Sequence, residues 1–311
     1  MTTARTRGLV LTTGDPRGVG PELLRRSLEQ LSEDLRGVPL HVLGARDAGP
    51  FPGATFEAVG PFDGSERSAG AVSGLALTRA VQLCLAGEAD AIVTGPVHKG
   101  ALHVAGYRTP GQTEMLGALA SAPRVGMLMA AERTRLGGPL RVLLVTTHVA
   151  LRRVPELLTT ELLVESARLT SRSLAERWGI GAPRLALCAL NPHASDGGLF
   201  GDEEARVLIP AVDEARRNGV ELTGPIPADT VFHRALQGEF DAVLAPYHDV
   251  GMAAFKTASF GGGVNVTLGL PFVRTSPDHG TAFDLVGTGR ADPSSFMEAI
   301  QLARRLSDPT L

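Results

Sequence analysis

Cysteine and long apolar runs are scarce in this chain. The two cysteines, Cys84 and Cys188, lie in apolar segments, so no disulfide framework is expected. The net charge of −3 gives no basic surface for nucleic acid or anionic lipid. No apolar run approaches the roughly 20 residues of a membrane span, and the apolar run near the N-terminus is too short for a signal peptide. We therefore expect a cytoplasmic protein without nucleic-acid or membrane partners.

Lysine is also rare: the chain has many arginines, but its only lysines are Lys99 and Lys256. A nucleotide bias in the genome explains the arginines but not the two exceptions. A compact ammonium and a planar guanidinium serve different purposes, so we interpret at least one lysine as functional, with Lys256 the stronger candidate. Of the three asparagines, Asn218 sits in a helix-ending turn, whereas Asn191 and Asn265 lie in polar segments considered below.

The chain alternates short β-rich runs with amphipathic helical stretches, which predicts an α/β fold with a mostly parallel sheet. Its 311 residues favour two domains over one core. The expected strands are residues 8–12, 40–43, 91–94, 141–146, 184–189 and 242–245. The expected helices are residues 21–31, 74–86, 155–178, 203–218 and 293–306.

Polar segments follow the expected strands: TTGDPRGVGPEL, TGPVHKGAL, TTHVALRRVP, LNPHASDGGLFGDEE and PYHD. In open α/β sheets, ligands bind outside the carboxyl ends of the strands. Loops rich in His, Asp, Asn and Gly at that edge therefore predict one common site.

Three histidines, His148, His193 and His248, each follow an expected strand. Three imidazoles with an open coordination position suit Zn²⁺, with Co²⁺, Mn²⁺ and Mg²⁺ as alternatives. Each histidine taken singly also reads as an ordinary polar residue. Asp249 is either an outer partner of an imidazole or a helix N-cap, and Asp229 is either an N-cap or a site carboxylate. Three other histidines, His41, His103 and His233, are interpreted as structural.

The glycine-rich GDPRGVG segment has neither the G-x-G-x-x-G order of a dinucleotide fingerprint nor a P-loop pattern. The segment from Ser259 to Asp284 is more informative. Asn265 and Arg274 flank what we expect to be one short apolar strand, and Arg274 is suited to gripping a carboxylate or phosphate. With Lys256 adding charge, these residues predict a small anionic substrate, such as a phosphorylated one.

Eight blocks of the sequence resemble the 4-hydroxythreonine-4-phosphate dehydrogenase family in order and over nearly the whole chain: GDPRGVGPE, TGPVHKGAL, GQTEML, VTTHVALRRV, LNPHASDGGLFGDEE, GPIPADTVF, YHDVGMAAFK and GGGVNVTLGLPFVRTSPDHGTAFDLVGTGRADPSSF. The resemblance implies two α/β domains around a central cleft, as in isocitrate and isopropylmalate dehydrogenases. It also implies a homodimer that completes each active site. We expect residues 1–125 plus 275–311 to form the first domain, and 126–274 to form a second domain that carries most metal and substrate ligands.

The resemblance also implies roles for individual residues. The family's metal-binding histidines fall on His148, His193 and His248, with one ligand supplied by the partner chain. Lys256 and Asp249 join them as expected catalytic residues. The implied substrate-binding residues are Gln112, Thr113, Lys256, Asn265 and Arg274. The segment that resembles the NAD adenosine loop comprises Asp278, His279, Gly280, Thr281 and Ala282.

The reaction implied by the resemblance is NAD-dependent and metal-dependent oxidation of 4-phosphohydroxy-L-threonine at its C3 hydroxyl. Decarboxylation to 3-amino-2-oxopropyl phosphate follows, as a step of pyridoxal 5′-phosphate biosynthesis. Asp249, Asp229 and a metal-bound water are the candidates for accepting the hydroxyl proton. Gln112 stands where the family has a histidine, and an amide hydrogen-bonds but carries no charge. We interpret this as a tolerated exchange; the alternative substrates are threonate and erythronate 4-phosphates.

Other function classes also fit parts of the pattern. Histidines and aspartates at strand ends suit a metal-dependent hydrolase with a metal-activated water, although the chain has no H-x-H or H-E-x-x-H pair. An acyl or phosphate transferase on a related fold would need neither metal nor nicotinamide. A non-catalytic metabolite-binding protein is a third alternative, and the retained His, Lys and Arg set argues against it. Substrate-dependent NADH absorbance separates the dehydrogenase from all three.

Overall fold

The computed structural model describes residues 7–109, 111–259 and 261–308. The chain forms two compact units, with Met1–Val125 and Val264–Leu311 in unit 1 and Gly126–Gly263 in unit 2. The sequence placed the second boundary after residue 274, so residues 264–274 belong to unit 1 and not to unit 2.

The sheet of unit 1 explains this correction. Its strand order is β3-β2-β1-β4-β11-β10. The bounds are β1 Leu9–Thr12, β2 Leu40–Ala45, β3 Thr55–Gly60, β4 Ala91–Thr94, β10 Val264–Leu268 and β11 Val273–Pro277. β1, β2, β3, β4 and β11 run parallel, and β10 pairs with β11 in antiparallel fashion. The sequence predicted that Asn265 and Arg274 flank one strand. They lie instead on two paired strands, β10 and β11.

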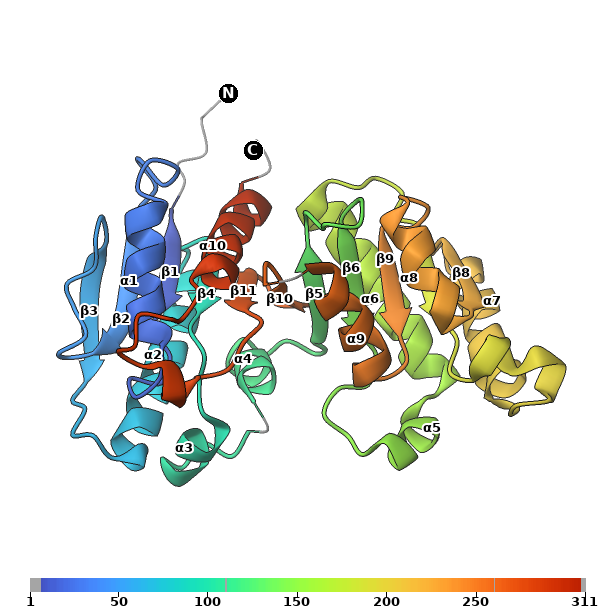
Figure 1. The fold of residues 1–311 in the computed structure, drawn as a ribbon, viewed down its shortest axis with the longest axis horizontal. Coiled ribbons are helices and arrows are strands. Elements are labelled where there is room, and N and C mark those ends of the chain that lie inside the picture. Colours follow the sequence, from blue (N-terminus) through green and yellow to red (C-terminus); the bar gives the residue numbers. More distant parts are fainter. Residues whose placement is uncertain (1–6, 110, 260, 309–311) are drawn as a thin grey trace. The chain divides into compact units, whose positions relative to one another are not determined.

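Helices cover the sheet of unit 1 (Figure 1). They are α1 Gly20–Gln30, α2 Glu66–Leu85, α3 Lys99–Val104, α4 Gln112–Leu119, η4 Phe283–Leu285 and α10 Ser294–Ser307. α2 packs on β1, β2 and β3 and also contacts α3 and α4, whereas α10 packs on β4, β10 and β11 and contacts α1. The apolar core under α2 includes Leu77, Val81 and Ile92.

By length and apolar composition, α2 is the one helix among the described residues that could cross a membrane. Of the tested window, 61% is buried inside the protein. Its buried residues, such as Val72, Leu77 and Val81, face the sheet and the neighbouring helices. This burial is what the core helix of a globular unit shows.

The strands of unit 2 have the order β5-β6-β9-β7-β8. The bounds are β5 Gly126–Ala131, β6 Leu140–Leu144, β7 Leu185–Cys188, β8 Leu222–Ile226 and β9 Ala242–Ala245. β6, β9, β7 and β8 run parallel, and β5 pairs with β6 in antiparallel fashion. The predicted α/β class with a mostly parallel sheet is thus confirmed in both units.

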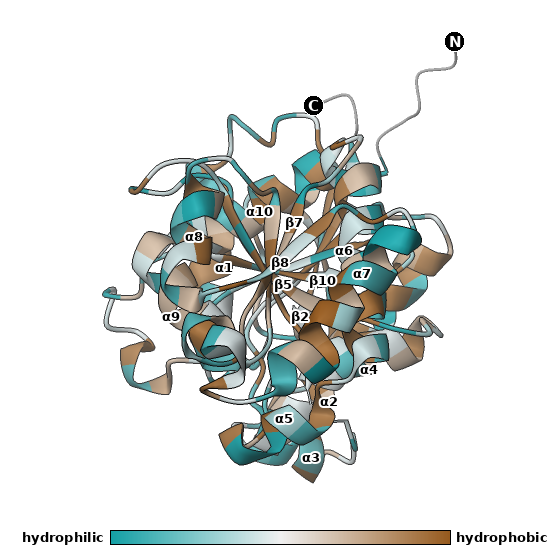
Figure 2. Ribbon diagram, turned by 90° about the vertical axis from the view of Figure 1, so that its right-hand side faces the viewer, coloured by the Kyte–Doolittle hydropathy of each residue, from teal (hydrophilic) through white to brown (hydrophobic). Residues whose placement is uncertain are grey.

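The helical segments of unit 2 are η1 Leu151–Arg153, α5 Val154–Leu157, α6 Thr160–Trp178, η2 Pro192–Gly198, η3 Glu204–Leu208, α7 Ile209–Arg217, α8 Ala228–Leu236 and α9 His248–Ser259. The single helix predicted for 155–178 is wrong: α6 starts afresh because the Thr159 hydroxyl accepts a hydrogen bond from the Leu162 amide at 3.1 Å. The helix predicted for 203–218 begins with the π-helical η3. In Figure 2 the helices α7 and α8 carry hydrophilic and hydrophobic residues together, as surface helices do.

Candidate active site

The three histidines follow three neighbouring parallel strands of unit 2. β6 pairs with β9, and β9 pairs with β7. His148 follows β6, His248 follows β9 and His193 follows β7. Since the carboxyl ends of parallel strands share one edge of a sheet, all three loops leave unit 2 at the edge that the sequence predicted.

His148 and His248 lie side by side. Their ring centroids are 5.5 Å apart and the planes are tilted by 41°. The Thr146 hydroxyl donates to the Pro246 carbonyl oxygen at 2.8 Å, which ties the two loops together. A pocket of about 330 Å³ opens here, lined by Thr147, His148, Val149, Leu151, Val154, Tyr247, His248 and Asp249.

Asp249 acts on the His248 imidazole. Its Oδ1 lies 2.7 Å from His248 Nδ1. A carboxylate accepts, so the proton sits on Nδ1 and the Nε2 lone pair is left for a metal. Asp249 lies in the first turn of α9, and its contact with His248 Nδ1 supports the interpretation that it orients the imidazole.

His193 is exposed on η2 and does not line the pocket of the other two histidines. In the described parts of the chain, no three His, Cys, Asp or Glu side chains gather closely enough to hold a metal ion. One chain therefore brings together two of the three predicted ligands and leaves the third apart.

Two further predicted residues of unit 2 lie on helices. Lys256 is exposed on α9. It lies two turns beyond Asp249 on the same face, because helical positions seven apart nearly coincide in direction. Asp229 is exposed in the first turn of α8, where Pro227 and not Asp229 is the N-cap residue.

Unit 1 buries a cation. Arg274, on β11, is 2% exposed. Its Nη1 donates to Thr267 Oγ1 at 2.9 Å, and its Nη2 donates to Thr94 Oγ1 at 2.6 Å and to Gln112 Oε1 at 3.3 Å. These three acceptors are neutral. Burial lowers the pKa of the Arg274 guanidinium to about 10, because the charged form is poorly solvated there.

Unmet hydrogen-bonding capacity surrounds this guanidinium. Arg274 Nε and Asn265 Oδ1 are both buried and lack a partner among the described residues. Asn265 is directly opposite Ser276 in the hairpin, so Asn265 and Arg274 share one face. Buried orphans of this kind call for a ligand or solvent, and a buried guanidinium calls for an anion.

Gln112 and Thr113 begin α4, beside Arg274. The Gln112 side chain is used at both ends, since its Nε2 donates to the Gly95 carbonyl oxygen at 3.3 Å and its Oε1 accepts from Arg274. Thr113 is 8% exposed. The N-cap residue Gly111 offers no side-chain acceptor, so the first amides of α4 add a partial positive charge near Arg274.

The expected cofactor segment follows β11 and packs against the loop after β1. The Val19 amide donates to the Thr281 carbonyl oxygen at 3.0 Å. A Cβ on Gly18 would lie 2.7 Å from that oxygen, which explains glycine there. The Asp278 amide donates to Ser295 Oγ at 3.0 Å, and the buried His279 Nε2 atom has no partner among the described residues.

The sequence did not predict two features, one in the histidine pocket of unit 2 and one beside the expected cofactor segment of unit 1. Tyr247 lines the histidine pocket, and burial raises the pKa of its phenol. Its place directly before His248 was the available signal. In unit 1, the Arg17 guanidinium lies 5.2 Å from the centroid of the Phe283 ring, beside the cofactor segment. No spacing rule pairs two residues so far apart in sequence.

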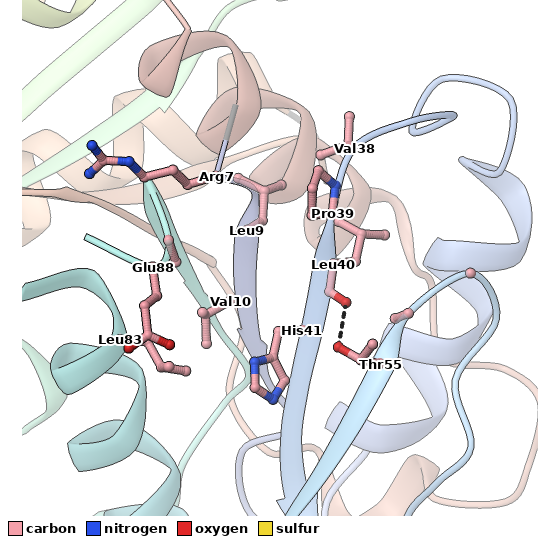
Figure 3. Close-up of a pocket in the computed structure, with 13 residues that line it drawn as sticks. Arg7, Leu9, Val10, Val38, Pro39, Leu40, His41, Thr55, Leu83 and Glu88 are labelled. Carbon is pink, nitrogen blue, oxygen red and sulfur yellow. Dashed lines mark hydrogen bonds between the residues drawn. The ribbon is translucent and has the colours of Figure 1, made fainter. Parts of the chain in front are cut away.

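A larger cavity, of about 550 Å³, lies in unit 1 at the amino ends of β1, β2 and β3 (Figure 3). Arg7, His41 and Glu88 are its charged or ionisable lining residues. Ligands of parallel sheets bind at the opposite, carboxyl ends, and none of the predicted site residues lines this cavity. We assign it no part in the reaction.

Known proteins share this sequence and fold. The sequence profile of the family described as "Pyridoxal phosphate biosynthetic protein PdxA" matches residues 44–303. A 4-hydroxythreonine-4-phosphate dehydrogenase from Geobacter metallireducens is 43% identical over 329 residues, covering 96% of this chain and 95% of that protein. One from Aromatoleum aromaticum is 45% identical over 317 residues, covering 95% of each.

Solved structures agree. The crystal structure of 4-hydroxythreonine-4-phosphate dehydrogenase from Klebsiella pneumoniae has a TM-score of 0.84 and 36% identity, covering 97% of this chain and 99% of that chain. A β-decarboxylating dehydrogenase from Thermococcus kodakarensis, at 14% identity and a TM-score of 0.54, covering 95% of this chain and 81% of that chain, shares the fold alone. The fold implied by the sequence is confirmed. On the strength of the profile match and these near full-length relatives, the chain belongs to the PdxA family of pyridoxal phosphate biosynthetic proteins.

Proposed function

We propose that the chain oxidises 4-phosphohydroxy-L-threonine at its C3 hydroxyl with NAD and a divalent metal ion, and that decarboxylation to 3-amino-2-oxopropyl phosphate follows. The relatives act on 4-hydroxythreonine 4-phosphate by name. The observation that carries the proposal on this chain is the buried Arg274 guanidinium, whose partners are neutral oxygens. Such a site suits a small anion such as a phosphate or carboxylate.

The donor set of unit 2 fits a metal ion. His148 and His248 lie side by side, and Asp249 holds the His248 ring with Nε2 as the available donor. Two imidazoles make an incomplete site, since catalytic zinc usually has three protein ligands. The third in this proposal is His193 of the partner subunit, consistent with the exposure of this residue on each chain. A homodimer is therefore part of the proposal, and Zn²⁺ is the preferred ion.

The chain's own residues bind and orient the substrate in this proposal. Arg274 holds an anionic group, with Gln112 and Thr94 fixing its guanidinium. Asn265 Oδ1, buried without a partner among the described residues, accepts from an N–H or O–H of the substrate. Thr113 and the first amides of α4 add donors, and Lys256 supplies a compact ammonium. Asp249 is committed to His248, which leaves Asp229 and a metal-bound water as candidate proton acceptors.

The two bound groups supply the chemistry that side chains lack. The metal, when bound, is a Lewis acid that lowers the pKa of the substrate hydroxyl, and NAD accepts the hydride. Asp278, His279, Gly280, Thr281 and Ala282 hold the adenosine end of NAD in this proposal. The buried His279 Nε2 atom, which has no partner among the described residues, supports it as a place where a ligand would bond.

The Gln112 contacts support the interpretation of this residue as a tolerated exchange. Both ends of this amide bond to the protein, so its role is to hold Arg274. A side chain engaged in this way does not need to be a histidine. Threonate and erythronate 4-phosphates remain the alternative substrates, because nothing in these contacts reads the amino group.

The test is NADH formation by the metal-loaded protein with each of the three phosphorylated acids in turn. A preference for 4-phosphohydroxy-L-threonine supports the proposal, and a preference for a sugar acid would keep the mechanism but replace the substrate. No turnover with any of them, both after EDTA treatment and after metal restoration, would overturn it. Sedimentation of the purified chain tests the dimer, and cell fractionation tests the proposed cytoplasmic location.

A further inference from the structure

The loop that carries His193 is fastened to a buried carboxylate. Glu204 is 1% exposed. Its Oε1 accepts from the backbone amides of Leu190 and Asn191 at 2.9 and 2.7 Å, and its Oε2 accepts from Asn191 Nδ2 at 2.8 Å. Three charge-assisted hydrogen bonds thus converge on one side chain directly before the Pro192–His193 step.

The backbone beyond this point is in a conformation that must be held. His193, Ala194, Ser195, Asp196 and Gly197 have φ angles of 52°, 54°, 64°, 44° and 69°. L-residues avoid this left-handed region because Cβ crowds the backbone, and they rarely occupy it in succession. Three backbone bonds close the turn: from the Ala194 amide to the Asn191 carbonyl oxygen at 3.2 Å, from the Leu199 amide to the Asp196 carbonyl oxygen at 3.4 Å, and from the Phe200 amide to the Ser195 carbonyl oxygen at 3.1 Å.

Glu204 itself begins a rare element. It is the first residue of η3, a π-helical turn that leads into α7. π-Helical turns are uncommon and occur often at functional sites. η2 and η3 are in contact, so the turn that carries His193 rests on the turn that carries Glu204.

We propose that Glu204 is a positioning residue for His193: acting through Asn191, it fixes the left-handed turn that presents the imidazole to the metal. The inference rests on the proposed function only in taking His193 as a metal ligand. Glu204 would not touch substrate, cofactor or metal.

The orientation of the Asn191 amide makes the proposal testable. Asn191 Nδ2 lies 2.8 Å from Glu204 Oε2 and 2.7 Å from Glu203 Oε2, so its nitrogen faces two carboxylates. In Glu204→Gln, one oxygen becomes an amide nitrogen, and it faces another donor. Asn191 cannot turn over to accept from it, because its oxygen would then face Glu203.

The experiment measures Zn²⁺ affinity by competition with a chelator, on the intact full-length protein. Loss of a group bonded to a metal ligand typically costs about 10- to 100-fold in metal affinity. Glu204 acts on His193 one step further away, through Asn191, so we expect a loss of about 10-fold, at the lower end of that range, for Glu204→Gln. The matched control is Glu221→Gln, the same change at an exposed position of unit 2, for which surface substitutions predict a change within about twofold.

A double variant adds a rescue. In Glu203→Gln with Glu204→Gln, both neighbours of Asn191 offer amide hydrogens, so the Asn191 amide turns over and its oxygen accepts from both. We expect the double variant to bind Zn²⁺ more tightly than Glu204→Gln alone. A double variant that binds as weakly as the single variant would contradict the hydrogen-bond assignment.

Wild-type Zn²⁺ affinity in Glu204→Gln would overturn the proposal. If that variant does not fold, as judged by thermal unfolding of the metal-free protein, Asn191→Ala decides. It keeps the two backbone bonds to Glu204, and unchanged Zn²⁺ affinity in it overturns the proposal as well. His193→Ala distinguishes failure of the proposed function from failure of this inference. If His193→Ala also keeps wild-type Zn²⁺ affinity, His193 is not a metal ligand. If only His193→Ala loses affinity, His193 is a ligand and Glu204 does not position it.

Discussion

His148 and His248 stand 5.5 Å apart, ring centroid to ring centroid, on loops that leave two hydrogen-bonded parallel strands. They are a hundred residues apart in sequence. Thr146 and Pro246, which are also a hundred residues apart, form a hydrogen bond that joins the two loops. The pairing of β6 with β9 is what brings the two imidazoles to one pocket.

Replacing His248 with alanine removes one imidazole of this pair. We expect metal-dependent turnover to be abolished while the protein stays folded, because the side chain is only half-buried and packs in no core. Metal content after dialysis and NADH formation are the measurements. His233→Ala on the exposed face of α8 is the control and should behave as wild type. Full activity of His248→Ala with unchanged metal content would refute the ligand assignment.

Arg274→Met should weaken substrate binding more than it weakens the fold. Losing a hydrogen bond to a charged group costs about 1.5–3 kcal/mol, which raises KM roughly tenfold to a hundredfold. The buried guanidinium of Arg274 contacts neutral partners, so its removal leaves no buried carboxylate behind.

Arg141→Met is the matched control for stability. Arg141 is also buried, but its guanidinium pairs with the Glu132 carboxylate at 3.0 and 2.8 Å. Breaking a buried ion pair from one side costs about 3–5 kcal/mol. Chemical denaturation of the metal-free proteins should rank Arg141→Met as the less stable variant. The reverse order would show that Arg274 serves the fold and not the ligand.

Gln112→Glu places a carboxylate next to the Arg274 Nη2 group. The new ion pair neutralises the buried cation that attracts the anionic substrate, so KM should rise, and by more than in Gln112→Ala. The effect should appear in KM with a smaller change in kcat, because the reacting carbon is not touched. Steady-state kinetics at fixed NAD check this, and a KM for Gln112→Glu at or below that of the alanine variant is incompatible with anion binding at Arg274.

Ala194→Gly should stabilise the protein. An L-residue in the left-handed region costs roughly 1–2 kcal/mol, and glycine removes this strain. Glycine also makes the unfolded chain more flexible, which offsets about 0.5–1 kcal/mol of the gain. A net gain of up to about 1 kcal/mol is expected. Ala175→Gly within α6 is the control and should lose stability. Urea denaturation of both variants measures the difference, and destabilisation by Ala194→Gly would argue against the left-handed turn.

Both thiols should be unreactive in the folded protein. Burial raises the pKa of Cys84 to about 12, with the nearby Asp90 adding to the shift, and burial likewise raises the pKa of Cys188 to about 12, with Glu204 adding to it. The thiolate is the reactive form, so its fraction at pH 8 falls far below that of an unfolded chain. The stability linked to these raised pKa values is complete below the unfolded value and is lost as pH rises toward about 12. Thiol titration with and without denaturant checks this; rapid reaction of the native protein would contradict the burial.

Particular residues show how far the sequence alone reaches. The alternation of apolar and amphipathic runs predicted the α/β class, because buried parallel strands must be apolar and their covering helices amphipathic. The same logic placed His148, His193 and His248 at the carboxyl ends of strands, since that position depends only on where each strand stops. The resemblance of the DHGTA and YHD blocks then pointed to the family.

Only the tertiary structure decided which of these residues meet. Gln112 and Arg274 are 162 positions apart, and their contact depends on β11 pairing beside β4. The hairpin that sets Asn265 opposite Ser276 moved the unit boundary, because strand pairing and not sequence order decides which unit a segment joins. The hydrogen bond from Asn191 Nδ2 to Glu204 likewise depends on the π-helical turn that begins at Glu204. Local pattern fixes what each segment becomes, whereas long-range pairing fixes which side chains share a site.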